Sequence, residues 1–474
     1  MLFNSYIFLI FITLFFLGWS FIKKYKRLRL LYICINSFVF YGWWDWRFLF
    51  LIITSGLIDY IAGLMIYNSS TLKRKKFYLY LSLAGNLISL SIFKYSVFIA
   101  ENIEYLAHLI GINLQLKSNI PPFMLILPVG ISFYTFQSIS YSIDIYKRKL
   151  LPTKNIIHFF TYLSLFPQLV AGPIVRATDL LPALLAPPKT SEFIRYTALK
   201  LVILGYFKKV FIADNIAPIV NQGFSNPYLE TSFIYWWVII ILFAIQIYCD
   251  FSGYSDIASG LIKLIGYRFK ANFNHPYLAT SLRDFWKRWH ISLSTWFQDY
   301  VYIPLGGSKV KESIIYRNIF LTMILSGMWH GASWNFIAWG MLHAFFLSLE
   351  RVFNIPNKVH IFLPWPNLIL RIITFSQILI GWVFFRAQTI GEALHITSCL
   401  FTLNYNKVIS SYKSGLFYIV IFCFMEAYII LKWDSKLFNQ PILKKIGEPI
   451  FLSIILAIII YFRGAGNEFI YFQF

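Results

Sequence analysis

The sequence predicts an all-α polytopic membrane protein with about eleven tilted helices that cross or half-cross the bilayer. Of its 474 residues, 58% are hydrophobic and only 13% are charged, whereas a soluble domain carries about 25% charged residues. Apolar runs recur from end to end, and a run of about 16 to 25 residues can cross, or nearly cross, the hydrocarbon core. No linker, low-complexity tract or soluble module interrupts them, so we expect residues 1–474 to form a single membrane domain.

The first apolar run covers residues 1–22 and has neither a basic start nor a small-residue cleavage site. A secretory signal peptide has both features. We therefore expect this run to remain in the protein as its first membrane helix.

The net charge of +22 is gathered in short stretches between the apolar runs. Clusters of Lys and Arg lie at residues 23–27, 73–76, 147–149 and 208–209. Cytoplasmic loops are enriched in these residues, so we expect the clusters to lie in loops on the inside. If the N-terminus lies outside, the C-terminus then lies outside as well. The basic charge indicates membrane topology and not a nucleic-acid partner.

The cysteines carry no metal or disulfide pattern. Cys34, Cys249, Cys399 and Cys423 are scattered, mostly within apolar runs, and no CxxC or Cys/His ligand spacing occurs. Such spacing is what predicts a zinc site or a disulfide framework. We therefore expect inert thiols and no bound metal.

Three segments differ from simple membrane spans because they mix apolar residues with polar residues, proline or glycine. They are residues 127–146 (LPVGISFYTFQSISYSIDIY), 166–176 (FPQLVAGPIVR) and 246–260 (QIYCDFSGYSDIASG). Polar or broken backbone is tolerated at membrane depth only where protein buries it or water lines it. Such features mark a pathway or a site, and the alternative is helix packing through small and hydroxyl residues.

Residues 271–303 are too polar to span the membrane. Their three tryptophans, together with Lys287 and Arg288, predict a helix at the level of the lipid headgroups. The basic loop GGSKVK follows directly. We therefore expect this interfacial helix to lie near the cytoplasmic face.

Residues 318–350 predict a broken membrane segment. Arg317 and Arg351 flank the segment, so both of its ends should lie inside and the chain must enter and return. The glycines and serine of GMWHGASW suit the turning point. His330 would then lie at depth, at the tip of a broken or paired helix.

Two of the eight histidines stand out, His290 on the interfacial segment and His330 in the broken segment. Burial disfavours a charged imidazole, and a neutral imidazole can accept a proton as a general base. Attack of a hydroxyl on an acyl thioester needs such a base. The alternative is a histidine that only satisfies hydrogen bonds. His343, one helical face along from the 330 region, is either a neighbour of His330 or a packing residue.

The blocks DFWKRWHISLSTWFQDYVYIPLGG and GMWHGASWNFIAWGMLH resemble the two signature blocks of the membrane-bound O-acyltransferase family. They are similar in particular to the bacterial branch with the alginate and peptidoglycan O-acetyltransferase subunits and the teichoic-acid D-alanine transferase. His290 and His330 stand forty positions apart, as in the family. The three polar segments at 127–146, 166–176 and 246–260 also resemble this branch, so the resemblance covers most of the chain.

The resemblance implies a ring of tilted helices around a central tunnel in a bacterial inner membrane. It implies that His330 is catalytic within the tunnel and that His290 supports it toward the cytoplasmic mouth. The implied donor is acetyl-CoA, with no tightly bound cofactor. Lys287 and Arg288 are candidates to bind its phosphates, and the alternative is that they only anchor the segment to membrane lipids.

The C-terminal tail, residues 464–474, ends in FIYFQF. It resembles the F-x-Y-F motif of these envelope systems, in which the tyrosine takes the acyl group. Tyr471 would be that residue, and its free pKa of about 10 makes it a poor nucleophile without a base. The alternative is an aromatic anchor at the outer membrane interface.

The leading hypothesis is an enzyme that moves acetyl groups from cytoplasmic acetyl-CoA across the inner membrane for O-acetylation of an envelope or exported polysaccharide. Alginate-like polymers, peptidoglycan and cellulose are candidate acceptors, reached indirectly through an extracytoplasmic acyltransferase partner protein. The alternative is D-alanyl transfer to teichoic acid from a carrier-protein thioester. A transporter or flippase is a third hypothesis, but such folds often contain internal repeats and we find no convincing one.

Overall fold

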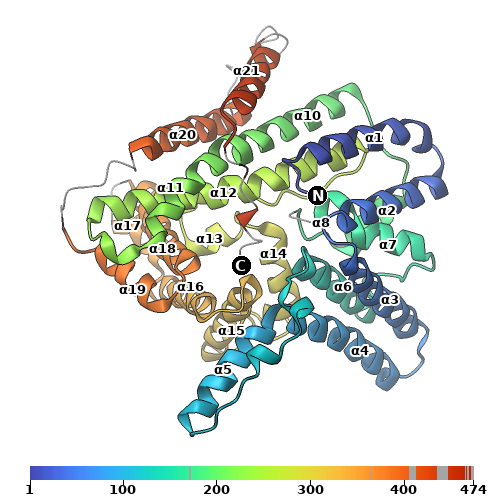
Figure 1. Ribbon diagram of the computed structural model, residues 1–474, viewed down its shortest axis with the longest axis horizontal. Helices are drawn as coiled ribbons and strands as arrows, with labels where there is room; N and C mark the ends of the chain where they lie inside the picture. Colours follow the sequence, from blue (N-terminus) through green and yellow to red (C-terminus); the bar gives the residue numbers. More distant parts are fainter. Residues whose placement is uncertain are drawn as a thin grey trace. The chain divides into compact units, whose positions relative to one another are not determined.

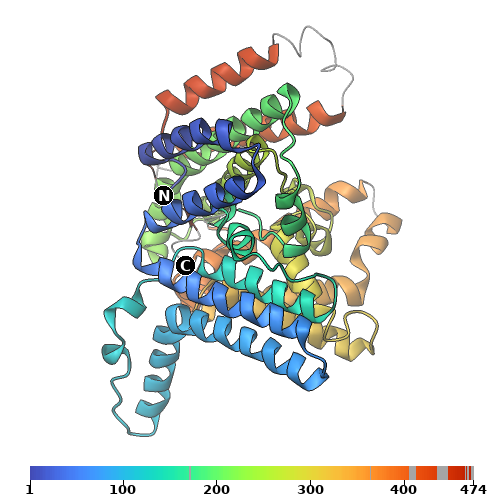
Figure 2. The same cartoon turned by 90° about the vertical axis from the view of Figure 1, so that its right-hand side faces the viewer.

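The computed structural model describes residues 1–169, 172–362, 365–404, 413–434, 447–464, 466 and 469–470. Every regular element in these ranges is helical, which confirms the predicted all-α class (Figures 1 and 2). Five helical stretches in this part of the chain are long and apolar enough to cross a membrane: Arg47–Asn68, Leu72–Leu109, Phe233–Leu264, Trp334–Phe353 and Pro366–Arg386. Three shorter apolar helices are Tyr6–Ile22, Ser414–Ile430 and Glu448–Tyr461. The protein is thus a multi-pass membrane protein, and the ring around a tunnel stays a prediction.

The chain forms two compact units, and the single membrane domain expected from the sequence stays a prediction. The first unit comprises Met1–Leu199 and Ala258–Lys270, and the second comprises Lys200–Ile257 and Ala271–Phe474. Helices α10 (Glu192–Tyr206) and α12 (Phe233–Leu264) contribute to both units.

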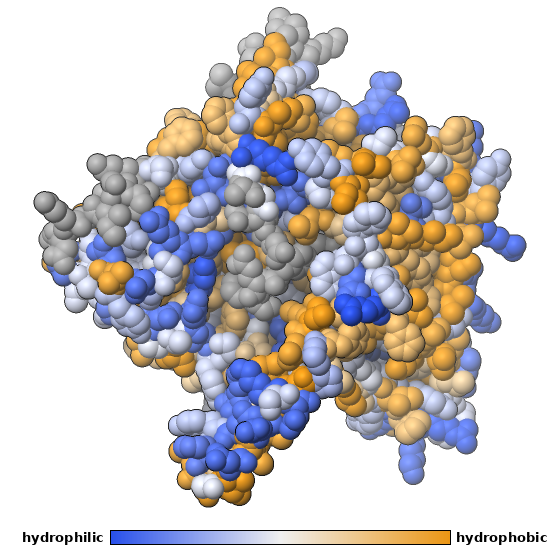
Figure 3. Space-filling view, in the orientation of Figure 1, coloured by the Kyte–Doolittle hydropathy of each residue, from blue (hydrophilic) through white to orange (hydrophobic). Residues whose placement is uncertain are grey.

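The first unit is a set of packed helices with short connections. In chain order they are α1 (Tyr6–Ile22), α2 (Lys26–Gly42), α3 (Arg47–Asn68), α4 (Leu72–Leu90), η1 (Ser91–Tyr95), α5 (Ser96–Leu109), η2 (Lys117–Asn119), η3 (Pro122–Leu125), α6 (Ile131–Tyr146), α7 (Ile156–Ser164), α8 (Phe166–Leu169) and α9 (Ala177–Leu185). Helices α3, α4 and α6 lie side by side. Exposed apolar side chains cover the outer surface of α1, in the right-hand region of Figure 3 where hydrophobic residues predominate. A large exposed apolar surface of this kind suits contact with lipid.

The polar residues of the 127–146 segment are buried between helices of the first unit. Ser142 on α6 accepts a hydrogen bond from Ser82 on α4 at 2.7 Å. Asn86 on α4 donates to the carboxylate of Asp59 on α3 at 2.9 Å. Buried polar groups need such partners because an unmet hydrogen bond costs free energy. For these residues, the structure favours the packing interpretation of the segment.

The 166–176 segment is anchored by its first residues. The Phe166 N–H donates to the Ser37 hydroxyl at 3.1 Å. Gly130, just before α6, has a φ of 74°, and a Cβ there would lie 2.3 Å from the Leu169 carbonyl oxygen. Only glycine suits both the left-handed backbone and this close approach. Val170 and Ala171 lie outside the described residues.

The second unit contains the remaining helices. They are η4 (Phe207–Ala213), α11 (Asp214–Ser225), η5 (Pro227–Leu229), η6 (Pro276–Leu278), α13 (Leu282–Trp286), α14 (Ile291–Phe297), η7 (Gln298–Tyr302), α15 (Glu312–His330), α16 (Trp334–Phe353), α17 (Ile355–Phe362), α18 (Pro366–Arg386), α19 (Ile390–Cys399), α20 (Lys413–Asp434) and α21 (Glu448–Tyr461).

Helices α15 and α16 form a hairpin across the predicted broken segment. A Cβ on Gly327 would lie 2.1 Å from the Phe336 carbonyl oxygen, and one on Gly340 would lie 2.4 Å from that of Met323. Glycine at both positions lets the two backbones touch, as in tightly packed membrane helices. The turn between the helices directly follows His330.

The segment 271–303 differs from the single interfacial helix that the sequence predicted. It contains the short helices α13 and α14, separated at His290, which has a φ of 41°. Trp289 and Trp296 are buried inside the second unit. Their rings pack against other aromatic side chains, so the backbone bends to follow the protein interior and not a flat membrane surface.

Lys208 and Lys209 also differ from the prediction, which placed them in a loop facing the cytoplasm. Both are buried in the π-helical turn η4. A Cβ on Gly205 would lie 2.7 Å from the Gly253 carbonyl oxygen, so the chain just before η4 touches α12 directly. This close approach brings the lysines to the carboxylates of α12.

Candidate active site

His330 is the last residue of α15 and is buried, with 4% of its surface exposed. Its ring centroid lies 5.0 Å from that of Trp329, 5.1 Å from that of Trp339 and 5.1 Å from that of Phe385. The N-terminal turn of α16 is fixed beside it, because the buried Asn335 donates to the Ala387 carbonyl at 2.6 Å. The imidazole is therefore buried among aromatic rings.

His290 is fully buried, and the loop that precedes η6 holds it in place. Its Nδ1 lies 3.3 Å from the Asn272 side-chain oxygen, which also accepts from the Ser292 hydroxyl at 2.9 Å. The Ile291 N–H donates to the Asn272 carbonyl at 2.9 Å. Burial lowers the pKa of His290 to about 3. The ring is neutral at physiological pH, and Nε2 carries the lone pair in the tautomer in which Nδ1 donates to Asn272.

One indole ring lies between the two candidate histidines. The Trp329 ring centroid is 6.0 Å from that of His290 and 5.0 Å from that of His330. The aromatic cluster continues from Trp339 to His343, with centroids 4.7 Å apart. Both residues that the sequence singled out thus belong to one cluster, and His343 joins them as a buried neighbour.

A cavity of about 690 Å³ opens beside this cluster within the second unit. Three cationic side chains line it, Arg283 and Lys287 from the α13 region and Arg351 from α16, and all three are exposed. The polar lining also includes the carboxylate of Glu350 and hydroxyl and amide groups from Ser281, Ser294, Thr295, Gln298, Tyr302, Ser308 and Asn354. Arg351 also lies 3.6 Å from Glu312, and cationic donors of this kind can bind the oxygens of a phosphorylated ligand.

A narrower, largely apolar cavity of about 120 Å³ shares Trp286 and Met323 with the larger one. Thr322 and Ser326 of α15 also line it. Ser326 precedes His330 by four residues, which is about one helical turn. His330 itself lines neither cavity, and Ser326 is the residue of the narrower cavity that lies nearest to it along α15.

The structure separates the two cations that the sequence proposed for phosphate binding. Lys287 lines the large cavity, whereas Arg288 is not among its lining residues. The Arg288 guanidinium pairs with Asp284 one turn earlier at 2.9 Å. Sequence reasoning did not select Arg283 or Arg351, although Arg351 was noted as the flank of the broken segment. Only the fold brings these residues to one cavity.

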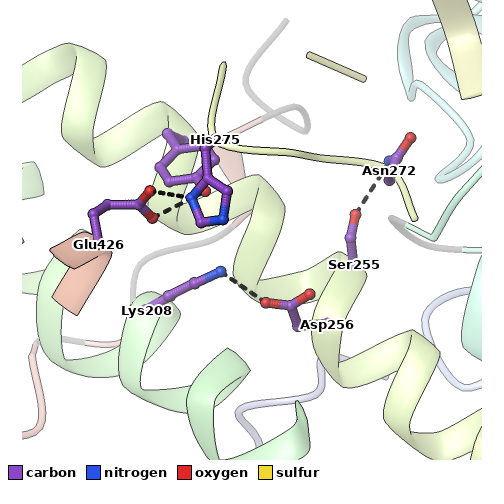
Figure 4. A network of polar contacts seen from close by, with 7 residues as sticks. Lys208, Ser255, Asp256, Asn272, His275 and Glu426 are labelled. Carbon is purple, nitrogen blue, oxygen red and sulfur yellow. Dashed lines mark hydrogen bonds and ion pairs between the residues drawn. The ribbon is translucent and has the colours of Figure 1, made fainter. Parts of the chain in front are cut away.

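Polar contacts tie the loop that carries Asn272 to α12 and α20 (Figure 4). Asn272 donates to the Ser255 hydroxyl at 3.2 Å, and His275 pairs with Glu426 at 2.6 Å. Lys208 in turn pairs with Asp256 at 2.8 Å. Asp256 and Ser255 both belong to the 246–260 segment, and of these two Ser255 contacts the Asn272 side chain that holds His290.

The remaining site predictions stand as follows. Tyr471 lies outside the described residues. Within the ranges that the structure describes, no three His, Cys, Asp or Glu side chains are grouped as metal ligands. Cys34, Cys249 and Cys399 are buried and Cys423 is exposed.

Comparison with known proteins gives a consistent result. The profile of the membrane-bound O-acyltransferase family matches residues 146–388. The probable alginate O-acetylase of Pseudomonas aeruginosa is 36% identical over 455 residues, covering 94% of this chain and 84% of its own. The peptidoglycan O-acetyltransferase of Helicobacter pylori is 37% identical, covering 85% and 80%. The teichoic acid D-alanyltransferase of Bacillus subtilis is 28% identical, covering 56% and 71%.

The matched range contains both histidines, the basic cavity and the α15–α16 hairpin. The high coverage of the two O-acetylating relatives shows that the likeness is not confined to these blocks. These matches favour an enzyme over a transporter or flippase. The chain belongs to the membrane-bound O-acyltransferase family and is an O-acyltransferase.

Proposed function

We propose that this enzyme moves acetyl groups from cytoplasmic acetyl-CoA across the bacterial inner membrane for O-acetylation of an envelope or exported polysaccharide. The observation that carries the proposal is a pair of cavities with shared lining residues, one lined by three cations and the other largely apolar and lined by Ser326, one turn before His330. The relatives named for alginate and peptidoglycan O-acetylation support this choice of acceptor class.

The donor fits the cavity by charge and size. Arg283, Lys287 and Arg351 would bind the phosphates of coenzyme A at the exposed mouth. A volume of about 690 Å³ falls within the range of about 300–1,000 Å³ that is common for ligand pockets. The narrow cavity beyond Trp286 would take the pantetheine end and the small acyl group.

The proposed chemistry uses His330, which is buried among aromatic rings, as a general base. His330 takes the proton of the Tyr471 phenol, and the phenolate oxygen attacks the thioester carbonyl. A C–O bond forms and the C–S bond breaks, and the proton then passes from His330 to the departing thiolate. The products are a tyrosyl acetyl ester and coenzyme A, with the histidine neutral again. His290, fixed by Asn272, supports this cluster through the Trp329 ring.

The acceptor side of the proposal rests on the C-terminal tail. Phe469 and Ile470, which directly precede Tyr471, are both buried inside the second unit. With the C-terminus outside, the acetyl ester would be offered to an extracytoplasmic acyltransferase partner protein. That partner would pass the acetyl group to the polysaccharide.

D-Alanyl transfer from a carrier-protein thioester is the second candidate. The likeness to the Bacillus subtilis teichoic acid D-alanyltransferase favours it, but with lower identity and coverage than the O-acetylating relatives. Co-purification of a dedicated carrier protein, and labelling from its alanyl thioester but not from acetyl-CoA, would favour this candidate.

The experiment that tests the proposal measures polysaccharide acetylation in cells that produce His330→Ala. We expect acetylation to fall at least about a hundredfold, as on removal of a catalytic general base, with protein level and melting temperature retained. His108→Ala is a matched control, because His108 is exposed at the end of α5. Normal acetylation in well-produced His330→Ala would exclude the proposed role.

A further inference from the structure

The start of the C-terminal tail and the residues just before it are attached to η4 and α11. The Asn215 side chain donates to the Phe462 carbonyl at 3.0 Å. The Gly464 N–H donates to the Val210 carbonyl at 3.3 Å. A Cβ on Gly464 would lie 2.8 Å from the Cβ of Asp214, so a side chain larger than glycine would push the tail away.

Two further residues of the tail are buried beside α12. Phe469 is fully buried, and its ring centroid lies 4.7 Å from that of Tyr254 and 5.5 Å from that of Phe251. The Ile470 N–H donates to Oδ2 of Asp250 at 2.7 Å. Chain ends are poorly ordered unless something ties them down. Here a carboxylate binds the backbone immediately before Tyr471.

Asp250 is itself held by a buried ion cluster. Lys209 Nζ lies 2.8 Å from Asp250 Oδ1 and 2.9 Å from Asp214 Oδ1, and all three side chains are at most 3% exposed. One oxygen of Asp250 thus faces the lysine and the other faces the tail. The cluster joins η4, α11 and α12, which are the elements that the C-terminal segment contacts.

A merely structural role is a poor explanation for this cluster. Apolar residues of similar volume fill such a space at no greater cost than a buried ion cluster. A charged oxygen is, however, a stronger acceptor for a backbone N–H than a neutral group. The cluster therefore provides a fixed, directional contact for one particular amide of the tail.

We propose that Asp250, oriented by Lys209, is a positioning residue that fixes the register of the C-terminal segment and so presents residue 471 for acyl transfer. The presentation step rests on the proposed function, whereas the anchoring of the segment does not. Asp250 does not line the donor cavity, so its removal should leave the binding of acetyl-CoA unchanged.

The test compares Asp250→Ala with Asp256→Ala in the purified full-length protein. Asp256 is a matched control because it lies on the same helix and pairs with Lys208 of the same π-helical turn at 2.8 Å, whereas the Ile470 N–H donates to Asp250. The first readout is the rate at which carboxypeptidase removes the C-terminal residues as far as Ile470. We expect Asp250→Ala to be digested about tenfold faster than the wild type, as for loss of one charge-assisted hydrogen bond. Asp256→Ala should stay within about twofold of the wild type.

The second readout is acetylation of the C-terminal peptide from isotope-labelled acetyl-CoA. Asp250→Ala should lower its maximal rate about tenfold and leave the half-saturating acetyl-CoA concentration unchanged, a split that a general loss of folding would not produce. Asp250→Asn keeps a neutral acceptor and should give an intermediate rate. If Asp250→Ala fails to fold, Ile470→Pro removes the N–H donor while leaving the ion cluster intact, and faster digestion is again expected.

The outcomes separate the two proposals. If Asp250→Ala and Ile470→Pro are both digested by carboxypeptidase and acetylated at the wild-type rates, the positioning role is overturned and the proposed function stays in place. A wild-type tail that never takes label, together with faster digestion of Asp250→Ala, would support the anchoring and overturn the acyl-acceptor role. If digestion is accelerated equally in Asp250→Ala and Asp256→Ala, the anchoring is overturned, because the digestion rate would then not depend on the contact with Ile470.

Discussion

Lys287→Gln should weaken the binding of acetyl-CoA without changing the chemical step. The Lys287 side chain lines the basic mouth of the cavity and is exposed, so its attraction for a phosphate is partly screened by solvent. An exposed ion pair is worth about 0.5–1 kcal/mol, which corresponds to a factor of about 2 to 5 in affinity. Because the contact is equal in the ground and transition states, the loss should appear in KM and not in kcat.

Arg288→Gln is the matched control, since it removes the adjacent cation. The Arg288 side chain pairs with Asp284 and does not line the cavity. Its removal should change KM by less than about twofold and lower stability by about 0.3–0.5 kcal/mol, the value of an i,i+4 ion pair. The assay is steady-state release of coenzyme A at low and high salt, and the effect of Lys287→Gln should shrink in high salt. A rise in KM for Arg288→Gln equal to that for Lys287→Gln would refute the assignment of the donor site.

Three further predictions follow from single contacts. Ser326→Trp should fill the narrow cavity before His330 and lower kcat at least about tenfold, as for blocked positioning of the reacting groups, measured by release of coenzyme A; an unchanged rate would place the acyl path elsewhere. His290 has a folded-state pKa of about 3, below the unfolded value of about 6.5, so the unfolded state binds the proton first and stability falls as the pH drops below about 6.5. The free energy of unfolding should fall by about 2 kcal/mol by pH 5. The melting temperature of His290→Gln should therefore fall less between pH 7 and pH 5 than that of the wild type, and an equal fall would contradict the lowered pKa of His290. Gly340→Val should separate α15 from α16, because a Cβ there would lie 2.4 Å from the Met323 carbonyl oxygen, and should lower the melting temperature by several degrees; an unchanged melting temperature would contradict the close packing.

The class of fold was predictable from the sequence because it depends on composition and run length. Long apolar runs in a chain with 13% charged residues can satisfy their backbone in lipid only as helices. The turn after His330 was also predictable, since Gly331 and Ser333 interrupt a run with cations at both ends. The family resemblance, not periodicity, gave the roles of the histidines.

Long-range contacts account for what the sequence did not predict. Lys209 follows the pattern of a basic loop, yet it is 1% exposed because two carboxylates neutralise it, Asp214 nearby in sequence and Asp250 on the distant helix α12. The segment 271–303 was expected to be one helix at the membrane surface, but Trp289 packs inward and the chain breaks at His290. No local pattern shows that Arg351 lines the same cavity as Lys287.

Asp250 illustrates both what the sequence predicts and what only the fold shows. It lies in the 246–260 segment, in which polar residues interrupt an apolar run, and such a segment marks a site or a packing contact. Its partner on the tail is the N–H of Ile470, and a backbone group has no signature in the sequence. The contact therefore became visible only when the fold placed the tail beside α12.

The measurement that tests the central claim most directly is mass spectrometry of the C-terminal peptide after incubation of the purified protein with isotope-labelled acetyl-CoA. Wild-type protein, His330→Ala and Tyr471→Phe are compared at equal concentration. The account predicts a label on Tyr471 in the wild type that is absent from both variants. A wild-type tail without label, in a system that still acetylates its polysaccharide, would contradict transfer through the tyrosine, and undiminished label in His330→Ala would contradict the histidine as the base.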